Sequence, residues 1–420
     1  MKEKKNDLWR YILHFAEWIA LALLLGGLGG LLGAAFHHTL HGVTDLREGN
    51  TWLIFLLPLG GLLSVSIYWL FRLQANRGTN EVIDAVLDGA PVKAAVAPTI
   101  FLSTTITHLL GGSAGREGAA LQLGGSTACL ISRFFRLTGK ERRILILSGM
   151  SAVFAGLFGT PLTATLFCME FASVGTWFSP ALLPCYLAAL IASRVSGALG
   201  VHAETAVLEA VTALNWANAW KFVVLAILLA LLGIFMCRVF HEAEHWMKRF
   251  LKNPWLRIAV GGVLILGITL LVGDHRYNGA GMHMALTAVA GEAAWQDFLL
   301  KMLLTAITLA AGFKGGEIVP TFCIGATFGC VAGSLLGLEP GMAAALGLVG
   351  LFCCATKSPF ASIVLSVEMF GGENLHIFAL VCVICFVLSG KGGLYSSQII
   401  QFDMASVLAQ EDACERVSQE

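Results

Sequence analysis

GGSAGREGAALQLGG, residues 111–125, is the stretch that decides the fold. Flexible glycines precede the charged pair Arg116 and Glu117, and an apolar run of good helix formers follows. A helix that begins here aims its unpaired backbone N–H groups and the positive end of its dipole at whatever precedes it, which makes an anion site. Glu117 is therefore a candidate functional carboxylate, although a cap satisfied by the helix start and Arg116 explains the motif equally well.

A second stretch of this kind, GFKGGEIVPTFCIGATFG, occupies residues 312–329. Its glycines permit an irregular backbone, and Pro320 suits the first turn of a new helix. Glu317 falls just before that helix, so two helix starts that each carry a carboxylate converge if the halves pack about a pseudo-twofold axis. The alternative for Glu317 is a plain ion pair with Lys314.

Three pairs of residues recur in the same order at a nearly constant separation. The separations are 200, 198 and 198 residues for Glu117 to Glu317, Pro161 to Pro359 and Glu170 to Glu368. This ordered set predicts two homologous halves, about 50–205 and 215–400, that meet around one site. Because Glu170 and Glu368 fall late in their apolar segments, we expect them to cap or pair at helix ends rather than to carry protons.

The composition indicates a protein that is solvated by a lipid bilayer. The chain has 420 residues, of which 57% are hydrophobic and 13% charged, and its mean hydropathy is +0.77. Soluble proteins keep roughly a quarter of their residues charged. A formal net charge of zero argues against nucleic acid as a partner. The eleven cysteines lie mostly inside apolar runs, so Cys382 and Cys385 are expected to pack rather than to bind metal.

Apolar stretches of spanning or near-spanning length recur along the chain. They cover about 15–40, 51–73, 96–111, 118–136, 143–158, 161–174, 179–200, 218–240, 257–273, 297–312, 319–337, 341–355, 359–371 and 374–390. Several are shorter than the roughly 20 residues that a spanning helix needs, and Gly or Pro separates them, which is typical of broken helices around an ion site. We expect one all-α integral membrane domain over 1–410, a short polar tail over 411–420 and no soluble regulatory domain.

The basic residues predict how the chain is oriented. Lys2, Lys4, Lys5 and Arg10 place the N-terminus in the cytoplasm, and basic loops follow at Arg133–Arg143 and Lys248–Arg257. The first apolar segment is longer than the apolar part of a signal peptide, so we expect it to be retained. The predicted location is a cell membrane crossed many times, as in a bacterial plasma or inner membrane.

The motifs together resemble those of the CLC channels and transporters. The resemblance rests on GREG before an apolar helix, GGEIVP in the second half and GGLYS near the C-terminus. It covers roughly residues 15–405. It implies a CLC-type fold with two inverted-topology repeats of broken, tilted helices and a homodimer with one pathway in each subunit. It implies no enzymatic activity, no cofactor and no metal.

Departures from the chloride-type motifs indicate a branch of that family. The family's Gly-Ser-Gly-Ile-Pro is absent, and Thr79 and Asn80 stand in its place within NRGTNEVIDAV. Glu317 replaces an apolar residue, Ala119 replaces a common proline, and Phe171 aligns with the inner proton-transfer glutamate of chloride/proton exchangers. This combination is similar to the fluoride-exporting branch, which implies a fluoride/proton antiporter that protects a cell from fluoride.

The resemblance also assigns roles to single residues. Glu117 corresponds to the gating glutamate, Glu317 to the second glutamate of the fluoride branch, and Tyr395 to the tyrosine whose hydroxyl donates to the anion. Thr79, with Asn80 beside it, takes the place of the serine ligand, and backbone N–H groups around Gly118 and Ile318 complete the anion cradle. A protonated carboxyl is a strong donor, and fluoride is the best acceptor among the halides, so Glu117 and Glu317 suit fluoride.

Two alternatives remain open from the sequence. A chloride/proton antiporter or a chloride channel of the same fold is one, because Thr79 carries a hydroxyl like the family's serine. A membrane-embedded enzyme is the other, but it needs a Ser/His pair, paired aspartates or a zinc motif, and the sequence has none at a suitable spacing. The histidines form no metal-binding motif, and His108 is expected to be packed or to lie on the surface.

Overall fold

The structure, a computed structural model, describes residues 2–401, with side chains described from residue 12 onward. The predicted polar tail, 411–420, lies outside this range, and so do the basic side chains that were used to orient the N-terminus. The predicted all-α architecture is confirmed. Besides helices, the described residues contain one parallel pair of two-residue strands, β1 (Ser173–Val174) and β2 (Ile399–Ile400).

The helices form two series that match in order. The first series is α1 (Lys2–Gly49), the 3-10 helix η1 (Thr51–Leu56), α2 (Leu57–Leu70), α3 (Thr79–Asp88), α4 (Val96–Leu109), α5 (Glu117–Phe134), α6 (Gly139–Phe158), α7 (Pro161–Glu170), the 3-10 helix η2 (Ser179–Ala181) and α8 (Leu182–Ala198). The second series is α9 (Ala219–Phe250), α10 (Pro254–Val272), α11 (Met282–Val289), α12 (Asp297–Ala311), α13 (Ile318–Leu336), α14 (Pro340–Thr356), α15 (Pro359–Phe370) and α16 (Leu375–Leu388). The predicted boundary between halves falls in the segment between α8 and α9.

Every apolar segment predicted from the sequence contains a helix, but α3 and α11 were missed. The helix α3 is amphipathic and has 10 residues, and α11 is apolar but has only 8, so neither forms an apolar run of near-spanning length. The C-terminal end of α9 was also misplaced, because this helix continues to Phe250 through charged residues that extend beyond the apolar stretch. Proline at the first helical position starts α7, α14 and α15, as its fixed φ and missing N–H favour.

The protein is a multi-pass membrane protein. Six helices or helix pairs among the described residues are long and apolar enough to cross a bilayer: Ile12–Gly49, Thr51–Leu70, Ser179–Ala198, Ala219–Phe250, Pro254–Val272 and Ile318–Leu336. Large apolar side chains point outward from them, including Leu271 and Leu335, which are 89% and 85% exposed. Such a surface is stable in lipid and not in water.

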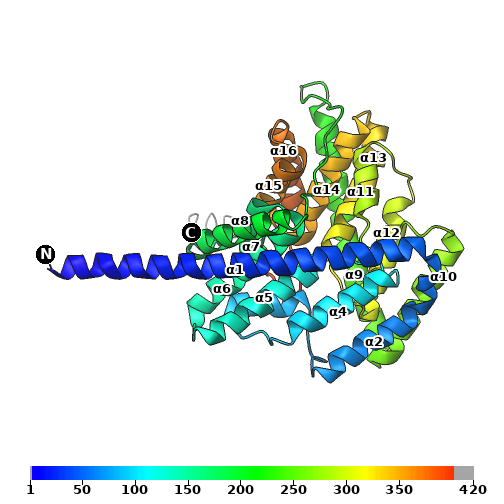
Figure 1. The fold of residues 1–420 in the computed structure, drawn as a ribbon. Coiled ribbons are helices and arrows are strands. Elements are labelled where there is room, and N and C mark those ends of the chain that lie inside the picture. Colours follow the sequence, from blue (N-terminus) through cyan, green and yellow to red (C-terminus); the bar gives the residue numbers. More distant parts are fainter. Residues whose placement is uncertain (1, 402–420) are drawn as a thin grey trace, which may run out of the picture.

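The long helix α1 runs along most of the molecule, and its first turns project beyond the other helices (Figure 1). In this view α4, α5 and α6 lie on one side of α1, and α7 and α8 lie on the other. It packs against α4, α6 and α8, so α1 joins helices of the first series on both of its sides.

Glycines allow α5 and α13 to pack very closely against the helix that follows each of them. A Cβ on Gly124 would lie 2.3 Å from the carbonyl oxygen of Gly149 on α6. The same contact recurs in the second half, where a Cβ on Gly325 would lie 2.3 Å from the carbonyl oxygen of Gly347 on α14. No side chain fits at these crossings, so the backbones that carry the two candidate site motifs are fixed by direct contact.

Glu170 and Glu368 cap helices, as the sequence predicts, and each caps a helix of the other half. Glu170, at the end of α7, accepts hydrogen bonds from the backbone N–H groups of Phe360 and Ala361 at 3.3 and 2.8 Å, at the start of α15. Glu368, at the end of α15, accepts from Leu162 and Thr163 at 3.0 and 2.8 Å, at the start of α7. This reciprocal pair fastens the two halves together.

Candidate functional site

The starts of α5 and α13 meet at an antiparallel bridge between Gly115 and Gly316. The N–H of Gly115 donates to the carbonyl of Gly316 at 2.6 Å, and the N–H of Gly316 donates back at 2.8 Å. A Cβ on Gly316 would lie 2.6 Å from the backbone nitrogen of Gly118, so only glycine fits here. The predicted convergence of two helix N-termini is therefore present, and both dipoles point their positive ends at one place.

Glu117 is the first residue of α5, and its carboxylate lies on the start of α13. Its Oε2 accepts hydrogen bonds from the backbone N–H of Val319 and of Arg116, both at 3.1 Å. Its Oε1 has no hydrogen-bond partner among residues 12–401, and the side chain is fully buried. The carboxylate therefore does cap a helix, but that helix belongs to the opposite half, and the cap occupies a position that would also suit an anion.

The guanidinium of Arg116 forms no ion pair with the Glu117 carboxylate. Its guanidinium donates to Glu204 at 2.8 Å and lies 5.0 Å from the ring centroid of Phe158. The ring of His37 is 3.3 Å from the same guanidinium. The arginine is thus held away from the carboxylate, so Glu117 remains without a direct cationic side-chain partner in the described range.

Glu317 is the N-cap residue of α13, as the motif predicts, but its side chain is directed differently from that of Glu117. It lines a cavity of about 560 Å³, and its Oε2 has no hydrogen-bond partner among the described residues. The alternative ion pair with Lys314 is absent from the ion pairs of this range, and the Lys314 ammonium lies 4.4 Å from the ring centroid of Tyr68 instead. Two glutamates that are equivalent in sequence thus face different surroundings.

Thr79 and Gly118 lie next to each other, as the predicted cradle requires. A Cβ on Gly118 would be 2.9 Å from Thr79 Oγ1, and Thr79 is the first residue of α3. Gly78, which precedes it, has φ +64° and allows the chain to turn into the helix. Thr79 also lines the cavity, so a third helix start is directed at the same region.

Tyr395 is 5% exposed and lines the cavity, where its ring packs edge-on against Phe171 with centroids 5.7 Å apart. Its hydroxyl has no hydrogen-bond partner among residues 12–401. Asn80 lines the cavity too, but its Oδ1 accepts from the backbone N–H of Ser397 at 2.9 Å. Asn80 therefore holds the segment that carries Tyr395. Phe171 is completely buried, so the ring of Tyr395 packs against an apolar side chain.

Gln122 is a residue of the site that the sequence analysis missed. It lies in α5, lines the cavity with Thr79 and Tyr395, and is 2% exposed. Its Nε2 donates to the carbonyl of Gly118 at 3.0 Å, whereas its Oε1 accepts no hydrogen bond from the described residues. Between Glu117 and Arg133, Gln122 is the one long polar side chain of α5, and this was the signal that could have identified it.

Unpaired polar atoms are concentrated at this site. Buried polar groups are nearly always hydrogen-bonded, yet four of them here have no partner within residues 12–401: Glu117 Oε1, Glu317 Oε2, Tyr395 Oη and Gln122 Oε1. The backbone N–H groups of three helix starts surround the same region. Such a set suits a small anion with water or protons beside it. No group of three metal-binding side chains occurs among the described residues.

His108 and the C-x-x-C pair play no part in the cavity. His108 is buried, and its Nε2 lies 3.3 Å from the carbonyl oxygen of Gly115, which supports the predicted packing role. Cys382 and Cys385 are buried free thiols, and the Cys385 thiol faces the carbonyl of Ala226 at 3.4 Å. Both cysteines therefore pack between α16 and its neighbours, as expected.

Comparison with known proteins gives one family. The family described as "Voltage gated chloride channel" matches residues 60–390. The "Chloride/fluoride channel protein" of Pseudomonas syringae pv. tomato (strain ATCC BAA-871 / DC3000) is 36% identical over 405 residues, which cover 94% of this chain and 89% of that protein. The "H(+)/Cl(-) exchange transporter ClcA" of Vibrio vulnificus (strain YJ016) is 25% identical over 454 residues, 99% of this chain and 97% of that one.

Solved structures agree with this result. The "Crystal structure of a CLC-type fluoride/proton antiporter" matches with a TM-score of 0.89 and 32% identity, over 93% of this chain and 99% of that chain. The "X-ray crystal structure of a slow cyanobacterial Cl-/H+ antiporter" matches with a TM-score of 0.77 and 21% identity, over 94% and 97% of the two chains, and supports the fold alone.

Proposed function

The chain belongs to the CLC family of chloride channels and transporters, and we propose that it is a fluoride/proton antiporter that exports fluoride from the cytoplasm. The observation that carries this proposal is the pair of glutamates at convergent helix starts. Glu117 accepts from the backbone N–H of Val319 in the first turn of α13, and Glu317 lines the cavity with an oxygen that has no partner among the described residues. The chloride-type motif has an apolar residue at the position of Glu317, so this second carboxyl favours the fluoride branch over the chloride members.

Glu117 couples the two ions by competition in this proposal. Its ionised carboxylate and an anion attract the same backbone N–H groups, so both cannot occupy the start of α13 together. Protonation removes the charge that holds the side chain there, and the anion then takes its place. Each exchange of the anion for the carboxylate thus accompanies the gain or loss of one proton at Glu117.

Glu317 accounts for fluoride over chloride. When protonated, its hydroxyl donates a hydrogen bond into the cavity beside the Tyr395 hydroxyl. Fluoride is smaller and accepts hydrogen bonds more strongly than chloride, so these donors replace more of its hydration. Phe171 leaves no carboxyl at the inner position, which makes Glu317 the carboxyl that handles protons on the cavity side.

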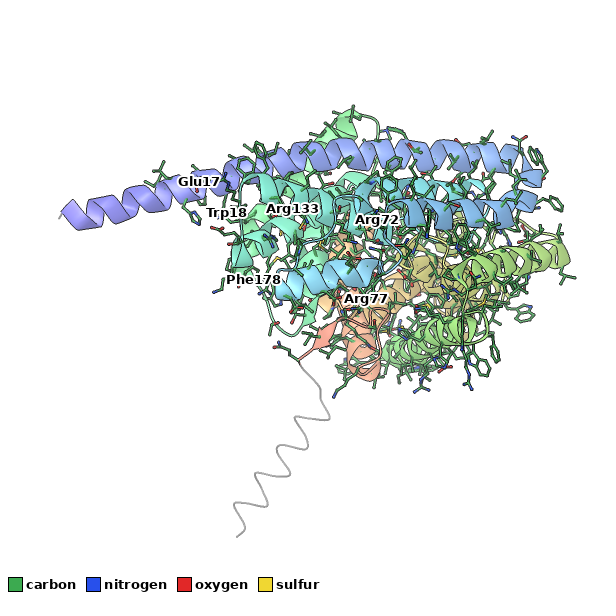
Figure 2. The ribbon with its side chains drawn as sticks, turned by 90° about the horizontal axis from the view of Figure 1, so that it is seen from below. Glu17, Trp18, Arg72, Arg77, Arg133 and Phe178 are labelled. Atoms are coloured by element: carbon green, nitrogen blue, oxygen red, sulfur yellow. The ribbon has the colours of Figure 1, made fainter. Side chains whose placement is uncertain are left out.

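The cavity faces the cytoplasm in the proposed orientation. Figure 2 looks onto a face that carries Arg72, Arg77 and Arg133, all of them exposed. Arg77 also lines the cavity, together with Lys248 near the end of α9 and Arg257 near the start of α10. Arginine and lysine concentrate on the cytoplasmic side of membrane proteins, which supports this orientation in a bacterial plasma membrane.

A homodimer is proposed from the family resemblance. Apolar side chains such as Leu182, Leu183 and Phe360, which are 43%, 47% and 55% exposed, extend from α8 and α15 and leave room for a second copy within the bilayer. Counting photobleaching steps of single labelled proteins in liposomes tests this. Two steps are expected, and one step would contradict the dimer.

A chloride/proton antiporter or a chloride channel is the second candidate, favoured by the hydroxyl of Thr79 and by the more distant relatives that exchange chloride. Efflux of each halide from reconstituted liposomes separates the candidates. We expect fluoride release to exceed chloride release by about tenfold or more, the order of one hydrogen bond to a charged group. Equal or faster chloride release would assign the chain to the chloride-transporting members.

A further inference from the structure

We propose that Lys314, Tyr68 and Arg257 form a second anion-binding position, in the cavity that leads to Glu317, where the transported halide is captured before it reaches the central site. This proposal rests on the proposed function for the identity of the anion. It concerns residues that are separate from the glutamates, the tyrosine and the helix starts described above.

Lys314 is an ammonium with unused hydrogen-bonding capacity. It lies in the turn between α12 and α13, three residues before Glu317, and it lines the cavity. Among the described residues its ammonium forms no hydrogen bond or ion pair, and it lies over the ring of Tyr68, whose centroid is 4.4 Å from Nζ. A cation–π contact offsets part of the cost of removing an ammonium from water, but it leaves the three N–H donors free.

Tyr68 and Arg257 add further free donors to the same cavity. Tyr68 is 6% exposed, and its hydroxyl has no partner among the described residues. Arg257, in the first turn of α10, has a buried Nε that also lacks a hydrogen-bond partner in this range. The three side chains come from α2, the α12–α13 turn and α10, so distant parts of the sequence contribute donors to one cavity.

The other cations of the cavity are already paired. Lys248 forms a short ion pair with Glu244, and Arg77 pairs with Asp84 at 2.9 Å. Lys314 and Arg257 form no ion pair within the described residues. The positive charge that is available to a ligand is therefore concentrated on these two residues, and the ligand that it fits is a small inorganic anion.

Capture at this position has a defined consequence for transport. A cation in a partly desolvated cavity raises the local concentration of the anion and the probability that it reaches the central site. Lys314 does not contact Glu117 or Glu317 by any hydrogen bond or ion pair in the described range, so it acts on anion entry and not on proton coupling. The half-saturating fluoride concentration should respond to its charge, whereas the fluoride-to-proton ratio should not.

The experiment measures fluoride efflux from liposomes over a range of internal fluoride concentrations, together with proton uptake. Lys314→Met, which keeps most of the side-chain length, should raise half-saturating fluoride by about tenfold, the order of one hydrogen bond to a charged group. Lys314→Arg should stay within about twofold, because the charge is kept. The matched control is Lys248→Met, since Lys248 lines the same cavity but is paired with Glu244.

Restoring the charge chemically removes any ambiguity from misfolding. The ten described cysteines are buried, so Lys314→Cys in a Cys414→Ser background offers one reactive thiol. Labelling Lys314→Cys with a reagent that attaches an aminoethyl group should restore the low half-saturating fluoride concentration. A reagent that attaches a sulfonate should raise that concentration further. Half-saturation that is unchanged in Lys314→Met, or a changed fluoride-to-proton ratio, would overturn the proposal.

A failure of the proposed function can be distinguished from a failure of the second anion-binding position. Wild-type protein that transports chloride and not fluoride would refute the fluoride proposal before any variant is made. The same variants would then be measured with chloride. The second anion-binding position would be supported if the charge at residue 314 determines the half-saturating concentration of the anion that the wild type transports, and refuted if it does not.

Discussion

Glu117→Gln should give the anion free access to the start of α13 and abolish proton coupling. The carboxylate is held there by two hydrogen bonds from backbone N–H groups, those of Val319 and Arg116, each 3.1 Å long. Hydrogen bonds to charged groups contribute about 1.5–3 kcal/mol, and neutral ones about 1 kcal/mol. The amide therefore holds its place less strongly by about 1 kcal/mol per bond, or about 2 kcal/mol in all, which corresponds to roughly 30-fold in a competition with an anion.

Isothermal titration of the purified protein with fluoride, paired with efflux measurements, tests this prediction. The dissociation constant of Glu117→Gln should fall by up to about 30-fold, and fluoride efflux should continue without proton uptake. Glu368→Gln is the matched control, because Glu368 also accepts two backbone hydrogen bonds at a helix start, at 3.0 and 2.8 Å, but does not line the cavity. Proton uptake that persists in Glu117→Gln would refute the competition mechanism.

Three further outcomes follow from the same geometry. Glu317→Gln should slow fluoride efflux by about tenfold while chloride efflux changes by less than about twofold, and an equal loss of both would count against a selective role. Gly118→Ala should slow both halides, because its Cβ would lie 2.9 Å from Thr79 Oγ1, whereas Gly197→Ala, with nothing within 4 Å, should behave like the wild type. Glu170→Ala removes both hydrogen bonds from the start of α15 and should lower the stability of the folded protein by about 1–3 kcal/mol in a thermal melt, without changing the fluoride-to-proton ratio of the folded fraction.

The sequence was sufficient to place the two candidate glutamates at helix starts. Glycines, then a carboxylate, then an apolar run can fold in few other ways, and Glu117 and Glu317 stand at the beginnings of α5 and α13. The capping roles of Glu170 and Glu368 were predicted for a similar reason, since both fall late in short apolar segments. What remained hidden was the partner, because each of Glu117, Glu170 and Glu368 caps a helix about 200 residues away.

Some of the site could not be predicted because its signal is three-dimensional. The helices α3 and α11 are too short to appear as apolar segments of near-spanning length. The hydrogen bond that Asn80 Oδ1 accepts from the backbone N–H of Ser397 joins residues that are 317 positions apart, so no local pattern indicates it. Gln122 and Tyr68 are candidate anion-site residues only because their side chains line the cavity and each has a polar atom without a partner among the described residues.

The most direct test of the central claim imposes a fluoride gradient on sealed liposomes that contain the purified protein and follows the proton concentration outside. Outward fluoride movement should drive protons inward against a proton gradient of opposite direction, and Glu117→Gln should abolish this uphill movement while fluoride still flows. Fluoride flow through the wild-type protein with no uphill proton movement would contradict the antiporter and would leave a channel.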